Sequence, residues 1–463
     1  MISPSRILPL VFASALFMEN MDSTVIATSL PAIASDLGTN PVALKLAFTT
    51  YLLSLTVFLP ISSWLADRFG ARTIFRLAVA IFTLASIACG FAHSLEYLIV
   101  ARGVQGLGGA LMVPVGRIVM LRTVPKAEYV NAMAWLTVPA LIGPLLGPPI
   151  GGFITTYFHW RWIFWMNLPF GILGIALATW LMPNMKDENF APLDLKGFVL
   201  SGLGLSLTVF GMTELGQGIF SAWIIFAMIA AGAGLIALYV RHAARTASPI
   251  LDLAMLQVQT LRVSIVGGMF FRIAAGAVPF LLPLLLQLGF GFSPFQSGSI
   301  TCASALGAVM MKFMAAQSLK RWGYRRLLIV NGIGSGILMA AIGLFTSATP
   351  FAVMMAVLLL GGLLRSLQFT SLNSIAYADV TSAEVGRANG LYTVAQQLSL
   401  ALGVAVAALT LEASQFMRGA EGLVRGDFAV AFFVVAVVGF ISTFFFARLP
   451  ADAGQNLSGH VAA

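Results

Sequence analysis

Long apolar runs divide the sequence, and most of them are close to the length that a helix needs to cross a lipid bilayer. Such a helix requires about 20 apolar residues, whereas the strands of a membrane barrel alternate apolar and polar positions over about ten residues. The runs here are continuous. They predict fourteen spans, at 7–30, 44–65, 73–92, 95–122, 129–155, 161–182, 196–215, 219–241, 261–288, 295–317, 325–347, 351–374, 385–411 and 428–448. Because only helices and closed barrels satisfy every backbone group inside lipid, we expect an all-α integral membrane protein.

The scarcity of charge excludes most other classes of protein. Only 9% of the 463 residues are charged, while 59% are hydrophobic, and a typical soluble domain has about 25% charged residues. This composition excludes a soluble enzyme and a disordered chain. A cleaved signal peptide is not expected, because Glu19 and Asp22 interrupt the first apolar run. The two cysteines and four histidines show no spacing typical of a metal site, so no metal is expected.

Basic residues are distributed unequally between alternate loops, and this bias predicts the orientation in the membrane. Nineteen Lys and Arg residues fall on one side, and only three, Arg161, Arg418 and Arg425, fall on the other. Because cytoplasmic loops carry the excess of basic residues, we expect both termini in the cytoplasm. The expected location is the inner (cytoplasmic) membrane of a bacterium, crossed many times. Attraction to anionic lipid head groups explains the excess of basic over acidic residues, so no nucleic-acid partner is expected.

Two cytoplasmic loops share a pattern that predicts an internal repeat. The segment 68–72 (Arg-Phe-Gly-Ala-Arg) after the second span recurs as 321–325 (Arg-Trp-Gly-Tyr-Arg) after the tenth. Duplicated transporter halves leave weak similarities of this kind. The pattern predicts an N-terminal six-helix bundle over 1–183, a linker with two extra spans over 184–249, and a C-terminal six-helix bundle with a short tail over 250–463.

Four segments carry a resemblance to a known family. Residues 63–72 resemble the signature loop G-x-L-A-D-R-x-G-R-R of the major facilitator superfamily, with departures at Ser63 and Ala71. Residues 143–152 match the antiporter motif G-x-x-x-G-P-x-x-G-G at every specified position. Residues 22–31 resemble the motif D-x-T-V-x-x-x-x-L-P of the fourteen-helix drug:proton antiporters, and 160–171 resemble the start of their sixth helix. The resemblance covers the whole chain and implies a major facilitator fold, with two six-helix bundles and two inserted helices.

The resemblance also implies a function. It points to a proton-coupled antiporter that exports small amphipathic compounds or drugs by alternating access, with the proton gradient as energy source and no cofactor. The expected partners are a small-molecule substrate, protons and the lipid bilayer, and a monomer is expected. A dedicated exporter of a metabolite or siderophore is the alternative, and the changes at Ser63 and Ala71 leave open a sensor that does not transport. No enzyme motif is found within a span, so an enzyme is not expected.

Candidate residues for proton coupling lie in the first and fourth spans. Glu19 and Asp22 are three residues apart and therefore share a helix face. A charge at a helix centre costs a few kcal/mol on insertion scales, and two neighbouring carboxylates repel, so one of them can hold a proton. Asp22 matches the family motif. Arg102 begins a stretch that resembles the family motif R-x-x-Q-G, and it would pair with a carboxylate and set its proton affinity. A static pair that fixes helix packing is the alternative.

Two motifs are candidates for conformational switching. The resemblance implies that Asp67 forms a latch with a helix N-terminus of the other half, near 384–387, when the carrier faces outward, an interaction worth about 0.3–1 kcal/mol. The glycines of the fifth span stand four residues apart and give a smooth face for close packing. We expect this bent face to seal and reopen the contact between the halves, although tight packing alone would explain the spacing. The switching candidates are Asp67, Arg68, Gly70, Arg72, Gly143, Gly147, Pro148, Gly151 and Gly152.

Other deep polar and aromatic residues are candidates for a substrate cavity. Arg272 and Arg365 lie in second-half spans that contain no deep acid. This pattern suggests an anionic or zwitterionic substrate, or pairing of these arginines with backbone carbonyls or with Glu19. The cavity candidates are Phe17, Asn20, Gln105, Met112, Trp135, Phe271, Arg272, Arg365, Gln368, Asn373 and Gln396.

Overall fold

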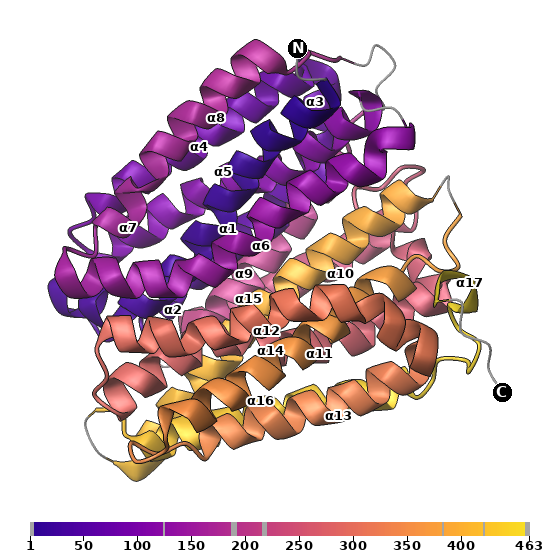
Figure 1. Ribbon diagram of the computed structural model, residues 1–463. Coiled ribbons are helices and arrows are strands. Elements are labelled where there is room, and N and C mark those ends of the chain that lie inside the picture. Colours follow the sequence, from indigo (N-terminus) through magenta and orange to yellow (C-terminus); the bar gives the residue numbers. More distant parts are fainter. Residues whose placement is uncertain are drawn as a thin grey trace.

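The computed structural model describes residues 4–123, 126–186, 192–214, 220–381, 384–419 and 422–458, and the side chains of 126–141 lie outside that description. Helices joined by short connections account for most of these residues, and no strand occurs among them (Figure 1). The two halves of the chain form two layers of helices. The first described helix, α1, begins at the end of the bundle where α3 (Ser62–Phe69) lies.

The N-terminal half contains six long helical segments. They are α1 (Pro4–Asp36), α2 (Lys45–Phe58), α4 (Ala71–Gly90), α5 (Leu95–Thr123), α6 (Lys126–Tyr157) and α8 (Asn167–Leu181). The second apolar run bends where η1 (Leu59–Ile61) joins α2 to α3, because Pro60 cannot donate a backbone hydrogen bond. The sixth run is divided into the short α7 (Trp162–Trp165) and α8.

The C-terminal half repeats this arrangement. After the short η2 (Leu253–Gln257) come α11 (Gln259–Leu284), α12 (Pro294–Trp322), α13 (Tyr324–Gly343), α14 (Phe351–Ile375), α15 (Val385–Arg418), α16 (Arg425–Phe446) and the terminal α17 (Gln455–Ser458). The end of α11 continues as a π-helical turn, η3 (Leu285–Gly289). A capping box at Ser293 and Gln296 starts α12, because each side chain accepts a hydrogen bond from the other residue's backbone.

The structure supports the predicted duplication residue by residue. The same shift in residue number relates Arg68 to Arg321 and α4 to α13. Under this shift, the first and last residues of α4 coincide with the first and last residues of α13. Gly70 and Gly323 precede these two helices, with φ of +96° and +66°, a region that glycine adopts at low cost. Between the halves, α2 packs on α15 while its counterpart α12 packs on α6. This reciprocal packing is expected of two copies, and the domain boundaries themselves stay a prediction.

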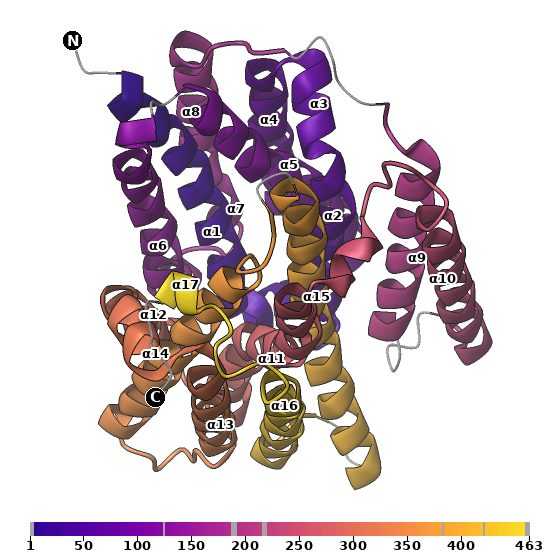
Figure 2. The same ribbon diagram turned by 90° about the vertical axis from the view of Figure 1, so that its right-hand side faces the viewer.

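The inserted helices form a hairpin outside the two bundles. Figure 2 shows α9 (Leu195–Glu214) and α10 (Ala222–Ala243) side by side at the edge of the molecule, and α9 alone of the two packs on both α2 and α15. Large apolar side chains of α10 are exposed, including Trp223 at 73% and Phe226 at 69%. Such a surface is suited to lipid rather than to water.

Twelve helical segments in the described chain are long and apolar enough to cross a membrane. They extend from Lys45–Phe69 to Arg425–Phe446 and include both helices of the hairpin. Two further helices, α1 with 33 residues and α6 with 32, occupy the first and fifth predicted spans but are not among the twelve. The protein is therefore an all-helical, multi-pass membrane protein. The count of fourteen spans and the cytoplasmic position of the termini stay predictions.

Candidate functional site

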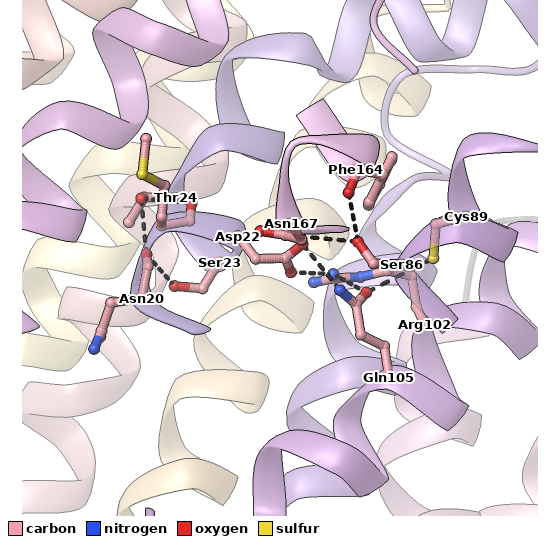
Figure 3. A network of polar contacts seen from close by, with 11 residues as sticks. Asn20, Asp22, Ser23, Thr24, Ser86, Cys89, Arg102, Gln105, Phe164 and Asn167 are labelled. Atoms are coloured by element: carbon pink, nitrogen blue, oxygen red, sulfur yellow. Dashed lines mark hydrogen bonds and ion pairs between the residues drawn. The ribbon is translucent and has the colours of Figure 1, made fainter. Parts of the chain in front are cut away.

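Asp22 and Arg102 form a buried ion pair inside the N-terminal half (Figure 3). The carboxylate comes from α1 and the guanidinium from α5, and Arg102 Nη1 lies 2.6 Å from Asp22 Oδ2. Each side chain is only 1% exposed. An exposed ion pair is worth about 0–1 kcal/mol, but removing one partner of a buried pair costs about 3–5 kcal/mol, because the other charge is left uncompensated. The structure thus brings together two of the three residues expected to couple protons.

Amide side chains complete the surroundings of Asp22. Its Oδ1 accepts hydrogen bonds from Gln105 Nε2 at 2.9 Å and from Asn167 Nδ2 at 2.8 Å. Arg102 Nη1 also donates to Gln105 Oε1, at 2.6 Å. Asn167 Nδ2 donates to Ser86 Oγ as well, at 2.9 Å. Gln105, which we expected in a substrate cavity, is inaccessible to solvent and belongs to this network instead.

Small residues of α5 bring the network close to α2. A side chain at Gly106 would collide with the backbone carbonyl of Tyr51, and one at Gly109 would meet the Tyr51 hydroxyl. This close approach places the Arg102 Cζ atom 4.2 Å from the centre of the Tyr51 ring, which is cation–π geometry. Glu19 is half-buried on α1 and acts electrostatically on Tyr51, so it is a neighbour of the network.

The network links the charge of Asp22 to helix packing. When the carboxylate is ionised, it is matched by a guanidinium and two amide donors from α5 and α8. A proton on Asp22 would cancel that charge and release Arg102 from its partner. The network therefore ties a buried charge on α1 to side chains of α5 and α8.

The predicted switching loop is built on a glycine turn with positive φ at Gly70. A side chain at Gly70 would collide with that of Asn184, and the next residue, Ala71, donates its N–H to Met185 O at 3.0 Å. The loop is therefore packed against the segment that follows α8. The neighbouring Arg68 is exposed, and Arg72 is half-buried at the start of α4.

The predicted latch is not formed through Arg387 in this conformation. Asp67 is half-buried on α3. Arg387, at the start of α15, lies 2.8 Å from Asp252 Oδ2 and 3.5 Å from Glu384 Oε1. Because the latch is expected in the outward-facing state, it stays a prediction.

The glycine face of α6 packs within its own half. Side chains added at Gly143, Gly147 or Gly151 would all collide with α1. The contact with the other half comes from the adjacent edge of α6, where Gly152 faces the start of α12 and the Pro148 carbonyl faces Gly298. The glycines spaced four residues apart therefore pack against α1. Pro148 and Gly152 lie at the contact between α6 and α12, which a rocking motion of the halves would change.

Hydrogen bonds also join the two halves. Phe295 N donates to Thr156 Oγ1 at 3.0 Å, and Gln287 Nε2 donates to Thr28 O at 2.9 Å. The first contact joins the end of α6 to the beginning of α12, and the second joins α1, near its end, to η3. They hold the halves together toward the end of the bundle that lies away from α3.

In the C-terminal half, Arg272 has neutral partners. This fully buried guanidinium on α11 donates to Ser264 O at 3.2 Å and to the Tyr392 hydroxyl. Tyr392 in turn donates to Asn373 Oδ1 at 2.6 Å. The predicted cavity residues Arg272 and Asn373 are thus joined through Tyr392, which belongs to no motif recognised in the sequence.

Arg365 lines a separate cavity inside the C-terminal bundle. Its guanidinium donates to Ser304 Oγ, and no carboxylate is among the partners described for it. The cavity has a volume of about 30 Å³, enough for about two water molecules. Phe271 lines the same cavity, whereas Gln368 is fully buried and accepts a hydrogen bond from Asn331 Nδ2 at 2.6 Å.

The other cavity candidates are scattered. Phe17 packs on Phe170 with ring centres 5.2 Å apart, Asn20 donates to its own helix, and Met112 is 2% exposed. Gln396 is half-buried on α15. The Trp135 side chain lies outside the described residues. The structure therefore does not gather these residues into one substrate cavity.

Comparison with known proteins identifies the family. The model of the Major Facilitator Superfamily matches residues 12–255 and 264–461. The chain is 35% identical over 452 residues to a protein of Salmonella heidelberg (strain SL476) whose assigned name is multidrug resistance protein MdtD, covering 96% of this chain and 95% of that one. The protein of the same name from Escherichia coli O6:H1 is 35% identical over 453 residues, covering 97% and 95%.

Solved structures show the same fold at low sequence identity. A D-xylose-proton symporter superposes with a TM-score of 0.71 at 13% identity, covering 98% of this chain and 99% of that one. The human organic anion transporter MFSD10 superposes with a TM-score of 0.62 at 15% identity, covering 96% and 100%. The family match spans nearly the whole chain, and the two multidrug resistance proteins match it over nearly their full length. The chain therefore belongs to the major facilitator superfamily and is a multi-pass membrane transporter, not an enzyme.

Proposed function

We propose that the protein exports small amphipathic compounds by alternating access, in exchange for protons carried by Asp22. The observation that carries the proposal is the buried ion pair between Asp22 and Arg102, with its amide donors Gln105 and Asn167. A charge placed at this depth is costly, so its presence needs a reason. The resemblance to proteins named for multidrug resistance supports the substrate class. We expect the protein to act as a monomer in the inner membrane of a bacterium.

The proposed cycle uses the pair as a switch. In the conformation described here, the halves are in contact near α12 and the ends of α1 and α6. When this end opens, a proton reaches Asp22 and neutralises it, and Arg102 loses its charged partner. The change in pairing between α1 and α5 favours the opposite closure, and the proton leaves on the other face. A ligand shifts such an equilibrium only through different affinities for the two states, and here the proton supplies that difference.

Proteoliposomes with an imposed pH gradient test the proposal. We expect the gradient to drive export of ethidium, an amphipathic fluorescent cation, and we expect dissipation of the gradient by nigericin to stop it. Asp22→Asn should lose this dependence on the gradient. Asp36→Asn is the matched control, since Asp36 also lies on α1 and 2.6 Å from an arginine, Arg161, but is 35% exposed. Transport that ignores the gradient in the wild-type protein, or full coupling in Asp22→Asn, would refute proton antiport.

The alternative of a dedicated anion exporter rests on the second half. Arg272 and Arg365 are described with neutral partners, so a substrate carboxylate could supply the missing negative charge. Competition against ethidium by amphipathic acids and amphipathic amines of matched size distinguishes the two functions. Stronger competition by the acids, lost in Arg365→Met, would favour the dedicated exporter.

A further inference from the structure

A second buried cluster of ionisable side chains lies where three parts of the chain meet. Lys45 begins α2 in the N-terminal half, Glu412 lies near the end of α15 in the C-terminal half, and Glu214 ends α9 of the inserted hairpin. Lys45 Nζ donates to Glu412 Oε1 at 2.8 Å, which bridges the two halves. Lys45 is fully buried and Glu214 is 1% exposed. No sequence pattern predicted this cluster, because each residue is a lone charge near a helix end.

Glu214 is the member of the cluster whose charge is least satisfied. Its Oε2 is buried and has no hydrogen-bond partner among the described residues. The charged groups that act on it are Lys45 from α2 and Glu412 from α15. The other helix packed on α9 is α10, whose charged residues Arg241 and His242 lie at its far end. A buried acceptor without a donor is unfavourable, and more so if it is ionised.

The charges of the cluster do not balance if all three groups are ionised. Two carboxylates and one ammonium leave a net negative charge in a site where Lys45 and Glu214 are buried and the Glu412 side chain is 16% exposed. Removing a charge from water is expensive unless it is paired, and a buried carboxyl group avoids that cost by taking up a proton. One proton shared by the two carboxylates makes the cluster neutral.

The other end of the hairpin shows the contrast. Asp194, which precedes α9, accepts hydrogen bonds from Gly197 N at 2.8 Å and Ile250 N at 3.2 Å, and its Oδ1 lies 2.8 Å from His242 Nε2. Burial alone would raise the pKa of Asp194, but these hydrogen bonds outweigh it and hold the pKa below its usual range. That end of the hairpin is therefore satisfied as an ionised carboxylate, whereas the Glu214 end is not.

We propose that Glu214 and Glu412, together with Lys45, form a second proton-binding site that the inserted hairpin holds against the contact between the two halves. One proton is bound while α2 and α15 lie together at this end and bury most of the cluster. When the halves separate there, water solvates both carboxylates and the proton leaves. The release step rests on the proposed alternating access, but the site does not depend on Asp22. It gives the inserted hairpin a role in the transport cycle.

Infrared spectroscopy of the full chain in liposomes tests the site directly, because a protonated carboxyl group has its own C=O stretching band. We expect the wild-type protein to show such a band over a range of pH in which exposed carboxylates are ionised. Glu214→Gln should lose one carboxyl group's share of the band, whereas Glu96→Gln, a change at an exposed carboxylate of α5, should leave it unchanged. Identical spectra for Glu214→Gln and the wild-type protein would overturn the proposal.

Two further variants keep the test decisive. Lys45→Met removes the positive charge, so the band should persist to higher pH than in the wild-type protein; a band that disappears at the same pH or lower would also overturn the proposal. Asp22→Asn should keep the Glu214 band even though it loses coupling to the gradient. If Asp22→Asn transports normally while Glu214→Gln loses the band, the proposed function fails and the second proton site stands.

Discussion

The two halves consist of equivalent helices, but one interior is polar and the other is largely apolar. The offset that carries Arg68 onto Arg321 carries Asp22, Ser86 and Gln105 of the polar network onto Ala275, Met339 and Leu358. In the N-terminal half these positions form a buried hydrogen-bonded network around an ion pair. In the C-terminal half their counterparts are apolar and line the cavity beside Arg365. One backbone arrangement therefore supports a buried ion-pair network in one half and an apolar cavity in the other.

The contrast extends to the charges themselves. Under the same offset, Glu19 corresponds to Arg272, and Met112 corresponds to Arg365. The N-terminal interior thus holds the Asp22 carboxylate with an arginine partner, while the C-terminal interior holds arginines described with neutral partners. The difference supports the proposal that proton binding belongs to the N-terminal half. It also predicts that equivalent substitutions in the two halves have different effects.

Replacing a buried arginine by methionine should give the largest difference between the halves. Arg102→Met leaves Asp22 buried without its cation, so we expect the free energy of unfolding to fall by about 3–5 kcal/mol at neutral pH. Arg365→Met leaves only the Ser304 hydroxyl without a partner, so we expect a change of about 1 kcal/mol or less. Thermal unfolding in detergent measures both. Equal losses would contradict the proposed asymmetry.

A pair of equivalent glycines should give a smaller difference. Gly108 is crowded, because an added Cβ would lie 2.6 Å from Phe82 N, whereas nothing lies within 4 Å of a Cβ added at Gly361. Overpacking of this kind costs about 1–3 kcal/mol, so Gly108→Ala should lower stability. Gly361→Ala adds a methyl group next to the cavity and removes a flexible glycine from a helix, so it should be neutral or stabilising by up to about 1 kcal/mol. A higher unfolding midpoint for Gly108→Ala than for Gly361→Ala would contradict the difference in packing between the halves.

The sequence predicted the fold well, because apolar runs and the repeated loop are local signals. The predicted span at 385–411 became α15, which is longer and ends at Arg418, and the predicted span at 44–65 became two helices joined at Pro60. Ends and bends of this kind depend on packing partners and on proline geometry rather than on the apolar pattern alone.

The candidate site was only partly predictable. Asp22 and Arg102 were found because buried charges are costly and because both belong to recognisable motifs. Asn167 lies in the recognised segment 160–171 but was assigned no role, and Ser86 belongs to no motif. A polar residue in an apolar run can face lipid head groups, a neighbouring helix or a cavity. Their roles depend on how α4 and α8 are rotated against α1, and that rotation comes from side-chain packing across the whole half.

The most direct test of the central claim compares two modes of transport in Asp22→Asn. Counterflow, in which labelled substrate exchanges for unlabelled substrate without a gradient, needs the halves to alternate but needs no proton. Export driven by a pH gradient needs alternation of the halves and also a bound proton. If Asp22 carries the coupled proton, Asp22→Asn should retain counterflow and lose gradient-driven export, while Asp36→Asn retains both. Gradient-driven export at the wild-type rate in Asp22→Asn would contradict the account.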